Sequence, residues 1–247
     1  MALESGSGRD SALQDFGAAF GEAFRLVASL DPDLVEIVGL SLRVSLSAVL
    51  AAALIGLPVG AALAVARFPG RGVALVALNS LMGLPPVVVG LLIYLALSRA
   101  GPLGPLGLLY TPSAMIIAQM VLVIPIVAAV TRQTVEDMKD EYDEQLRALG
   151  VGTGGMVATL LWDGRYSLLT ALLAGFGRAI AEVGAVIIVG GNIDHVTRVM
   201  TTAIALETSK GDLALALGLG LILLALAIGV NAAVMGLRRT AGHASYG

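Results

Sequence analysis

Two opposite charges, Arg178 and Glu182, lie inside one long apolar segment of the sequence. They are four residues apart, so on a helix they share one face. A charge at the centre of a membrane span costs roughly 2.5–3.5 kcal/mol on insertion scales. A pair of charges there therefore indicates a structural or functional role that offsets this cost. One interpretation is an interhelical clamp, and the other is an anion path in which Arg178 attracts the ion. We favour the clamp, because a strong cationic site would trap an anion and Glu182 would repel it.

Prolines and hydroxyl groups mark two further segments. Pro85 and Pro86 interrupt an apolar segment and lack the amide donor of a regular helix, so we expect a kink that either lines a path or serves helix packing. Thr197, Thr201 and Thr202 belong to a hydroxyl-rich segment whose O–H groups could pass a tetrahedral oxyanion along by weak contacts. The alternative for these threonines is an ordinary loop with a short helix at the membrane surface.

The sequence offers little for catalysis or metal binding. It has no cysteine and only two histidines, far apart in the chain, which predicts neither a catalytic set nor a metal site. The glycine cluster at 150–155 lacks the Gly-Lys-Ser/Thr ending that holds a nucleotide phosphate, so we expect no ATP site in this chain. The net charge of −3 argues against binding to nucleic acid.

The composition is that of an integral membrane protein. Of the 247 residues, 57% are hydrophobic and 13% are charged, and the mean hydropathy is +0.90. A soluble domain of this size has no way to bury so much apolar side chain. The predicted fold is therefore all-α with about five transmembrane helices. The apolar segments long enough to cross a bilayer are 44–66, 72–98, 113–130, 166–190 and 213–237.

The charged residues divide the chain and orient it. We predict an extracytoplasmic segment at 1–36 with an amphipathic helix on the membrane surface, a transmembrane domain at 37–237 and a cytoplasmic tail at 238–247. Lys and Arg favour one set of connections, which includes the connection 133–165, so we place that side in the cytoplasm. The N-terminus is then outside and the C-terminus inside.

The connection 133–165 contains a charged helix with one apolar stripe. The stripe consists of residues at helical spacing, namely Val135, Met138, Tyr142, Leu146 and Leu149. Glycines from Gly150 onward end the helix. Such a helix could dock on a partner protein, or it could be a solvated connection that packs on the membrane surface. The residues alone support both interpretations equally.

Several motifs resemble one family. Glu144 to Gly150 resembles the EAA loop of ABC importer permeases, in which a Glu stands six residues before a Gly. Arg178 to Ala185 resembles the Arg-Ala-x-Gly-Glu-x-Gly-Ala run of molybdate and related oxyanion permeases, with Ala181 in place of Gly. Further pieces are similar to the tungstate branch of that family: FPGR (68–71), GLPPVVVGL (83–91), GPLGPLGLLYTPSAMIIAQ (101–119), VGGNI (189–193) and TRVMTTAIALETSKGD (197–212).

This resemblance implies the type I fold of ABC importer permeases, in the inner membrane of a prokaryote. The chain would be the membrane subunit that translocates an oxyanion, foremost tungstate, into the cytoplasm. The ATPase-coupling residues would be Glu144, Leu146, Ala148 and Gly150. At 165–167 the chain has Arg-Tyr-Ser where the family usually has a Leu-Pro pair, which predicts a differently shaped docking elbow.

The partners implied by the resemblance are a second copy of the chain, two ATP-binding subunits that hold ATP and magnesium, and an extracytoplasmic oxyanion-binding protein. The chain itself would contact membrane lipid and would not be an enzyme. One alternative is a molybdate or sulfate permease of the same architecture. An ion-coupled secondary carrier is the alternative from a different class, but such carriers usually have an internal repeat and coupling carboxylates of their own.

Overall fold

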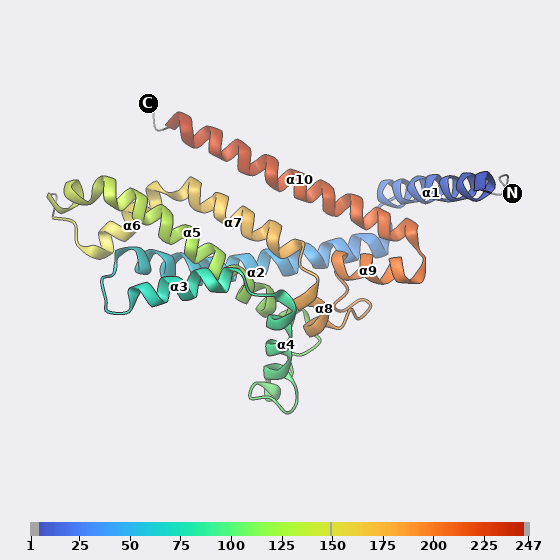
Figure 1. The fold of residues 1–247 in the computed structure, drawn as a ribbon, viewed down its shortest axis with the longest axis horizontal. Coiled ribbons are helices and arrows are strands. Elements are labelled where there is room, and N and C mark those ends of the chain that lie inside the picture. Colours follow the sequence, from blue (N-terminus) through green and yellow to red (C-terminus); the bar gives the residue numbers. More distant parts are fainter. Residues whose placement is uncertain (1–4, 149, 245–247) are drawn as a thin grey trace.

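The computed structural model describes residues 5–148 and 150–244, without the side chains of 5–16, 143–144, 146–147, 153 and 237–244. Every regular element in these ranges is a helix, which confirms the all-α prediction. Figure 1 shows α2, α5, α7 and α10 along the long axis of the molecule and α4 across it. In chain order the helices are α1 (Ser5–Ala28), α2 (Pro32–Val65), α3 (Arg71–Met82), α4 (Pro86–Leu97), η1 (Gly104–Leu106), α5 (Pro112–Ala148), α6 (Thr153–Asp163), α7 (Arg165–Ile180), α8 (Gly184–Gly190), α9 (Met200–Lys210) and α10 (Leu213–Ala244).

Between three and five segments of the described chain could cross a membrane. The single helices long and apolar enough to do so are Pro32–Val65, Pro112–Tyr142 and Leu213–Gly236. Two bent pairs also qualify: α3 and α4 meet at 100°, and α7 and α8 meet at 59°. The predicted segments 72–98 and 166–190 are therefore each built from two helices rather than one.

The break between α3 and α4 lies at the two prolines, as their chemistry predicts. α3 ends and α4 begins on either side of residues 83–85. The amides of Gly83 and Leu84 bond to carbonyls in the last turn of α3, at 3.1 and 3.3 Å. Pro85 and Pro86 have no amide hydrogen, so the helical ladder does not continue through them.

Two glycines one turn apart bring α2 directly against α5. A Cβ atom at Gly60 would lie 2.3 Å from the carbonyl oxygen of Ala128, and one at Gly56 would lie 2.9 Å from the side chain of Val127. A residue with a side chain has no room at either position without moving a helix. Val127 and Phe176 belong to the same buried cluster, so α7 packs on the pair formed by α2 and α5.

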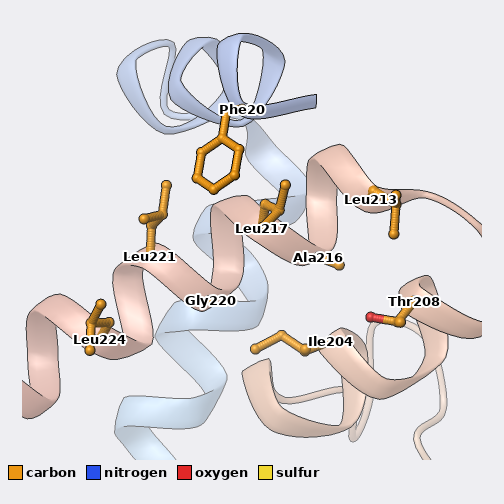
Figure 2. Close-up of a pocket in the computed structure, with 9 residues that line it drawn as sticks. All are labelled: Phe20, Ile204, Thr208, Leu213, Ala216, Leu217, Gly220, Leu221 and Leu224. Carbon is orange, nitrogen blue, oxygen red and sulfur yellow. The ribbon is translucent and has the colours of Figure 1, made fainter. Parts of the chain in front are cut away.

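The predicted N-terminal amphipathic helix exists as α1, which packs beside the start of α10 (Figure 1). Ala23 of α1 is fully buried there. An apolar pocket of about 400 Å³ lies between α1, α9 and α10. Figure 2 shows the ring of Phe20 directed toward α10 near Leu217 and Leu221. The lining side chains are apolar except for Thr208, so this pocket does not have the donors of an anion site. The position of α1 on a membrane surface stays a prediction.

The charged helix predicted before Gly150 continues the preceding span, because α5 runs without interruption from Pro112 to Ala148. Gly150 has a φ of +72°, the left-handed conformation that favours glycine at the end of a helix. α6 then folds back on α2 and α5, where Val135 and Leu160 are fully buried. The sharp turn predicted at Gly150 is confirmed.

Candidate functional site

The predicted polar pair lies at the break between α7 and α8. Arg178 is in the last turn of α7, but α7 ends at Ile180, so Glu182 lies beyond it. The prediction that both residues occupy one continuous helix is therefore wrong. The ion pair itself exists, with 3.4 Å between Nη1 of Arg178 and Oε2 of Glu182. The side chain of Arg178 is 44% exposed, whereas that of Glu182 is 4% exposed.

The carboxylate of Glu182 stabilises the start of α8. Its Oε1 atom accepts a hydrogen bond from the amide of Ala185 at 3.2 Å. Its own amide donates to the carbonyl of Ala179 at 3.1 Å, and its carbonyl accepts from the hydroxyl of Thr201 at 2.9 Å. Glu182 therefore serves as a cap at the break as well as a partner of Arg178.

Two polar side chains that we did not predict support this region. Gln119 of α5 is buried, and its Nε2 atom donates to the carbonyl of Ala179 at 2.9 Å. Ser41 of α2 accepts from the amide of Met200, the first residue of α9, at 2.8 Å. The signal for Gln119 is its type, since it is the one side-chain amide within the apolar segment 113–130. Buried polar groups of this kind require a hydrogen-bond partner, and here the partners are backbone groups at the ends of α7 and α9.

All three predicted threonines are buried, and protein groups engage their hydroxyls. Thr197 donates to the carbonyl of Gly190 at 2.6 Å and accepts from the amide of Ile193 at 2.9 Å. The hydroxyl of Thr202 accepts from the amide of Val199 and donates to the carbonyl of the same residue. The hydroxyl of Thr201 donates to the carbonyl of Glu182, as described above. These hydroxyls hold the connection between α8 and α9. Their contact with a transported anion stays a prediction.

The two helix breaks lie next to each other. A Cβ atom at Gly184 would lie 2.8 Å from the side chain of Val87, and one at Gly90 would lie 2.7 Å from the Cα atom of Ala185. α4 therefore rests closely on α8. The structure brings together the proline break at 83–85 and the break that carries Arg178 and Glu182, although they are about a hundred residues apart in sequence.

A set of exposed residues lies at both breaks. On α7 and α8 it consists mainly of small and apolar residues, with the guanidinium of Arg178 among them. Its members there are Ala174, Arg178, Ala181, Val183 and Ile187. On α3 and α4 it continues with large apolar residues, namely Leu81, Met82, Val87, Val88 and Leu91. We refer to these residues as the break face.

The second candidate region is the connection from α5 to α6. Ala148 and Gly150 are exposed there, and a Cβ atom at Gly150 would meet no neighbour within 4 Å. The side chains of Glu144 and Leu146 lie outside the described part of the structure, and so does Leu149. The backbone of Glu144 and Leu146 belongs to the last turns of α5. Ala148 and Gly150 are therefore accessible to a partner protein.

At the same end of the molecule, charged residues join α2, α3 and α5. Glu136 of α5 pairs with Arg132 one turn before it and with Arg71 at the start of α3. Arg71 also donates from Nε to the carbonyl of Leu63 at 2.9 Å. Arg71 is the last residue of the FPGR motif, so this network fixes the connection from α2 to α3.

The opposite end carries a charged surface that joins α2 to the loop after α8. His195 is exposed, and its Nδ1 atom lies 2.9 Å from Oε2 of Glu36. Arg198 pairs with Asp194 at 2.7 Å. The hydrogen bond to Glu36, together with the negative charges of Glu36 and Asp194, raises the pKa of His195 above its ordinary value of 6.5.

Within the described residues, no group of three or more His, Asp or Glu side chains is arranged to hold a metal ion. The polar groups near the break face belong instead to one ion pair and a set of hydrogen bonds to backbone. Such an arrangement can orient helices and present one guanidinium, a group that binds anions.

The chain belongs to the family of inner membrane components of binding-protein-dependent transport systems, whose model matches residues 56–240. It is a permease, a membrane component of a transport system. The matched region contains both helix breaks and the connection from α5 to α6.

Three relatives illustrate the range of the family. The chain is 42% identical over 204 residues to a probable anion ABC transporter permease protein of Haloferax volcanii, covering 81% of this chain and 88% of the relative. It is 40% identical over 219 residues to the tungstate uptake system permease protein TupB of Peptoclostridium acidaminophilum, covering 89% of this chain and 96% of the relative. A sulfate transport system permease protein CysW of Synechococcus elongatus is 29% identical over 177 residues, covering 69% and 62%.

Proposed function

We propose that this protein is the membrane-spanning permease subunit of an ATP-driven importer that carries tungstate into the cytoplasm. The observation that carries the proposal is the 40% identity to a tungstate permease across 96% of that relative's length. The sulfate relative is more distant at 29% identity, so sulfate transport is less well supported. Molybdate, an anion of similar shape and charge, is the second candidate.

The position of Arg178 and of the two helix breaks supports the break face as the lining of the anion's translocation path. A guanidinium at the depth of an apolar span is costly against lipid, so Arg178 is better placed against water or a second protein surface. At the neighbouring break, Pro86 removes the amide that would bond to the carbonyl of Met82 in a regular helix. Irregular backbone at membrane depth is tolerated where it lines a watery cavity or is covered by protein. We therefore propose that the break face lines the translocation path.

The geometry supports different roles for the two members of the polar pair, Arg178 and Glu182. Glu182 is buried and gives one carboxylate oxygen to the cap of α8, so it holds the break. Arg178 is nearly half exposed and bonds to Glu182 within its own segment of chain. This arrangement supports Arg178 as a weak anion contact on the path, and it supports the clamp interpretation for Glu182 alone. A partly neutralised cation also suits release of the anion.

Transport in this scheme requires partners. We propose a homodimer, two ATP-binding subunits that hold ATP and magnesium, and an extracytoplasmic binding protein that delivers the anion. The ATP-binding subunits would dock at Glu144, Leu146, Ala148 and Gly150. The exposed turn at Gly150 supports this docking, because a Cβ atom at Gly150 would meet no described neighbour within 4 Å. ATP hydrolysis then belongs to the partner, and this chain moves the anion.

Uptake of labelled tungstate tests the transported ion directly. Cells with and without the gene are compared, and unlabelled tungstate, molybdate and sulfate compete in turn. We expect uptake to depend on the gene and to be displaced by tungstate at the lowest concentration. Equal displacement by sulfate, or uptake that is unchanged without the gene, would overturn the proposal.

The orientation has its own test. We propose that the connection from α5 to α6 is cytoplasmic and that the segment between the end of α8 and the start of α10, which includes α9, is outside. Gln145→Cys and Ser209→Cys place thiols at exposed positions on the two sides. An impermeant thiol reagent should label position 209 in intact cells and position 145 only after lysis. The reverse pattern would invert the topology.

A further inference from the structure

A cavity of about 520 Å³ lies at the end of the molecule that carries the connections from α2 to α3 and from α5 to α6. Figure 1 shows both connections at this end. Two cations line the cavity: Arg67 follows α2, and Lys139 belongs to α5. The other lining residues contribute apolar groups and backbone and no carboxylate: Val65, Ala66, Val151, Gly152 and Met156.

Neither cation is neutralised within the described residues. No ion pair or hydrogen bond joins the side chain of Arg67 or Lys139 to another described residue. Nearby, Arg71 and Arg132 share the carboxylate of Glu136. The same end of the molecule therefore contains two arginines that share one carboxylate and, at the cavity, two cations without a partner among the described residues. Two neighbouring cations that line one cavity favour an anionic ligand.

The loop that presents Arg67 is held in place. The Ala66 amide bonds to the carbonyl of Ala62 at 2.8 Å, and the Arg71 amide bonds to the carbonyl of Phe68 at 3.3 Å. The guanidinium of Arg71 also bonds to α2, as described above. Arg67 is thus presented from a backbone fixed on both sides.

The cavity lies where a membrane span ends. The apolar helix α2 stops at Val65, two residues before Arg67. Phe68 is 43% exposed in the same loop, and Trp162 of α6 is 69% exposed with the guanidinium of Arg165 5.0 Å from its ring centre. Exposed aromatic side chains at the ends of spans are typical of the interface between membrane and water. These exposed aromatic residues support a position of the cavity near the level of lipid headgroups.

We propose that this basic cavity binds the phosphate-bearing headgroup of an anionic phospholipid, with Arg67 and Lys139 contacting the phosphate. Basic pockets between helices at the cytoplasmic membrane surface are suited to such headgroups. A free phosphate would use the two cations but not the apolar part of the lining, whereas a lipid uses both. The inference does not depend on which oxyanion is transported.

Lipid binding to the purified full-length protein tests this site by native mass spectrometry. The probes are short-chain phosphatidylglycerol, phosphatidylcholine as the neutral comparison, and inorganic phosphate as the free anion. The test variant is Arg67→Gln combined with Lys139→Gln. Arg99→Gln is the control, since Arg99 is an exposed cation outside the cavity. A second variant, Arg67→Lys with Lys139→Arg, keeps both charges.

We expect phosphatidylglycerol to bind the unaltered protein, the Arg99 control and the charge-preserving variant alike, and to bind the neutralised variant about thirtyfold more weakly. Equal binding of phosphatidylcholine would overturn the proposal. So would inorganic phosphate that displaces the lipid at equal concentration, because the ligand would then be a free anion. Unchanged lipid binding in the neutralised variant, with loss of ATPase co-purification, would assign the two cations to the partner protein instead.

Discussion

Substitutions at Glu182 can separate the two interactions that its carboxylate makes. Glu182→Gln keeps an acceptor for the Ala185 amide but removes the charge that pairs with Arg178, whereas Glu182→Ala removes both. The ion pair is 3.4 Å long and Arg178 is 44% exposed, so we reduce its contribution for solvent screening to about 0.5–1 kcal/mol. Leaving the buried Ala185 amide without its acceptor costs a further amount of about 1–3 kcal/mol.

We therefore expect Glu182→Gln to lower the free energy of unfolding by about 1 kcal/mol or less, and Glu182→Ala by roughly 1.5–4 kcal/mol. The assay is the thermal unfolding midpoint and the yield of the assembled full-length transporter, measured for both variants side by side. Glu141→Ala is the matched control, because Glu141 is an exposed glutamate of α5. Equal losses for the Gln and Ala variants would show that the ion pair, and not the cap, holds this break.

Arg178→Gln completes the comparison. If Arg178 contacts the anion, this variant assembles normally and loses tungstate uptake, because the removed group contributes little to the fold. If Arg178 is part of a clamp, yield falls together with uptake. Normal yield with normal uptake would refute both roles.

Three further perturbations test other parts of the structure. Gly60→Val should prevent α2 from packing on α5, at a cost of roughly 1–3 kcal/mol or more, whereas Gly39→Val, which meets no neighbour, should leave the thermal unfolding midpoint nearly unchanged. Gly150→Val forces a β-branched residue into a left-handed turn, so we expect normal membrane insertion but weak co-purification of the ATPase; normal tungstate-stimulated ATP hydrolysis would contradict this. Because the pKa of His195 is raised in the folded state, its contact with Glu36 stabilises the fold fully below about pH 6.5 and this contribution is lost as the pH rises through the raised pKa. The backbone of His195 has a φ of +56°, a conformation that Asn tolerates. His195→Asn should therefore flatten that pH dependence of the unfolding midpoint.

Features that depend on local chemistry were predictable from the sequence. Uninterrupted apolar segments located the helices of the membrane domain, because a charge inside a span is costly. Pro85 and Pro86 located the first break, since a missing amide ends a helical ladder in any context. Gly150 located the turn after α5, since a positive φ favours glycine. In each case the residue type alone is a sufficient physical cause.

The break between α7 and α8 has a different origin, and the sequence did not predict it. No proline lies at 181–183, and Ala181 is a good helix former. The carbonyls freed by the break bond instead to Gln119 on α5 and Thr201 on α9. These donors come from positions distant in sequence, so only the packed structure reveals that the broken form is satisfied. The interaction between Arg178 and Glu182 survives the break because the bend of 59° keeps them within reach.

The two breaks lie close together because α4 packs on α8, and this packing couples the movement of the two helices. α4 makes its largest set of contacts with α8, and Gly90 and Gly184 leave no room between the two helices. The two helices must therefore move together, or the backbone contact at Ala185 must open. Glu182 caps the helix on which α4 rests, so a change in that cap acts on the proline break as well as on its own. An anion that draws Arg178 away from Glu182 would act on the same cap, which links occupation of the proposed path to the position of α4.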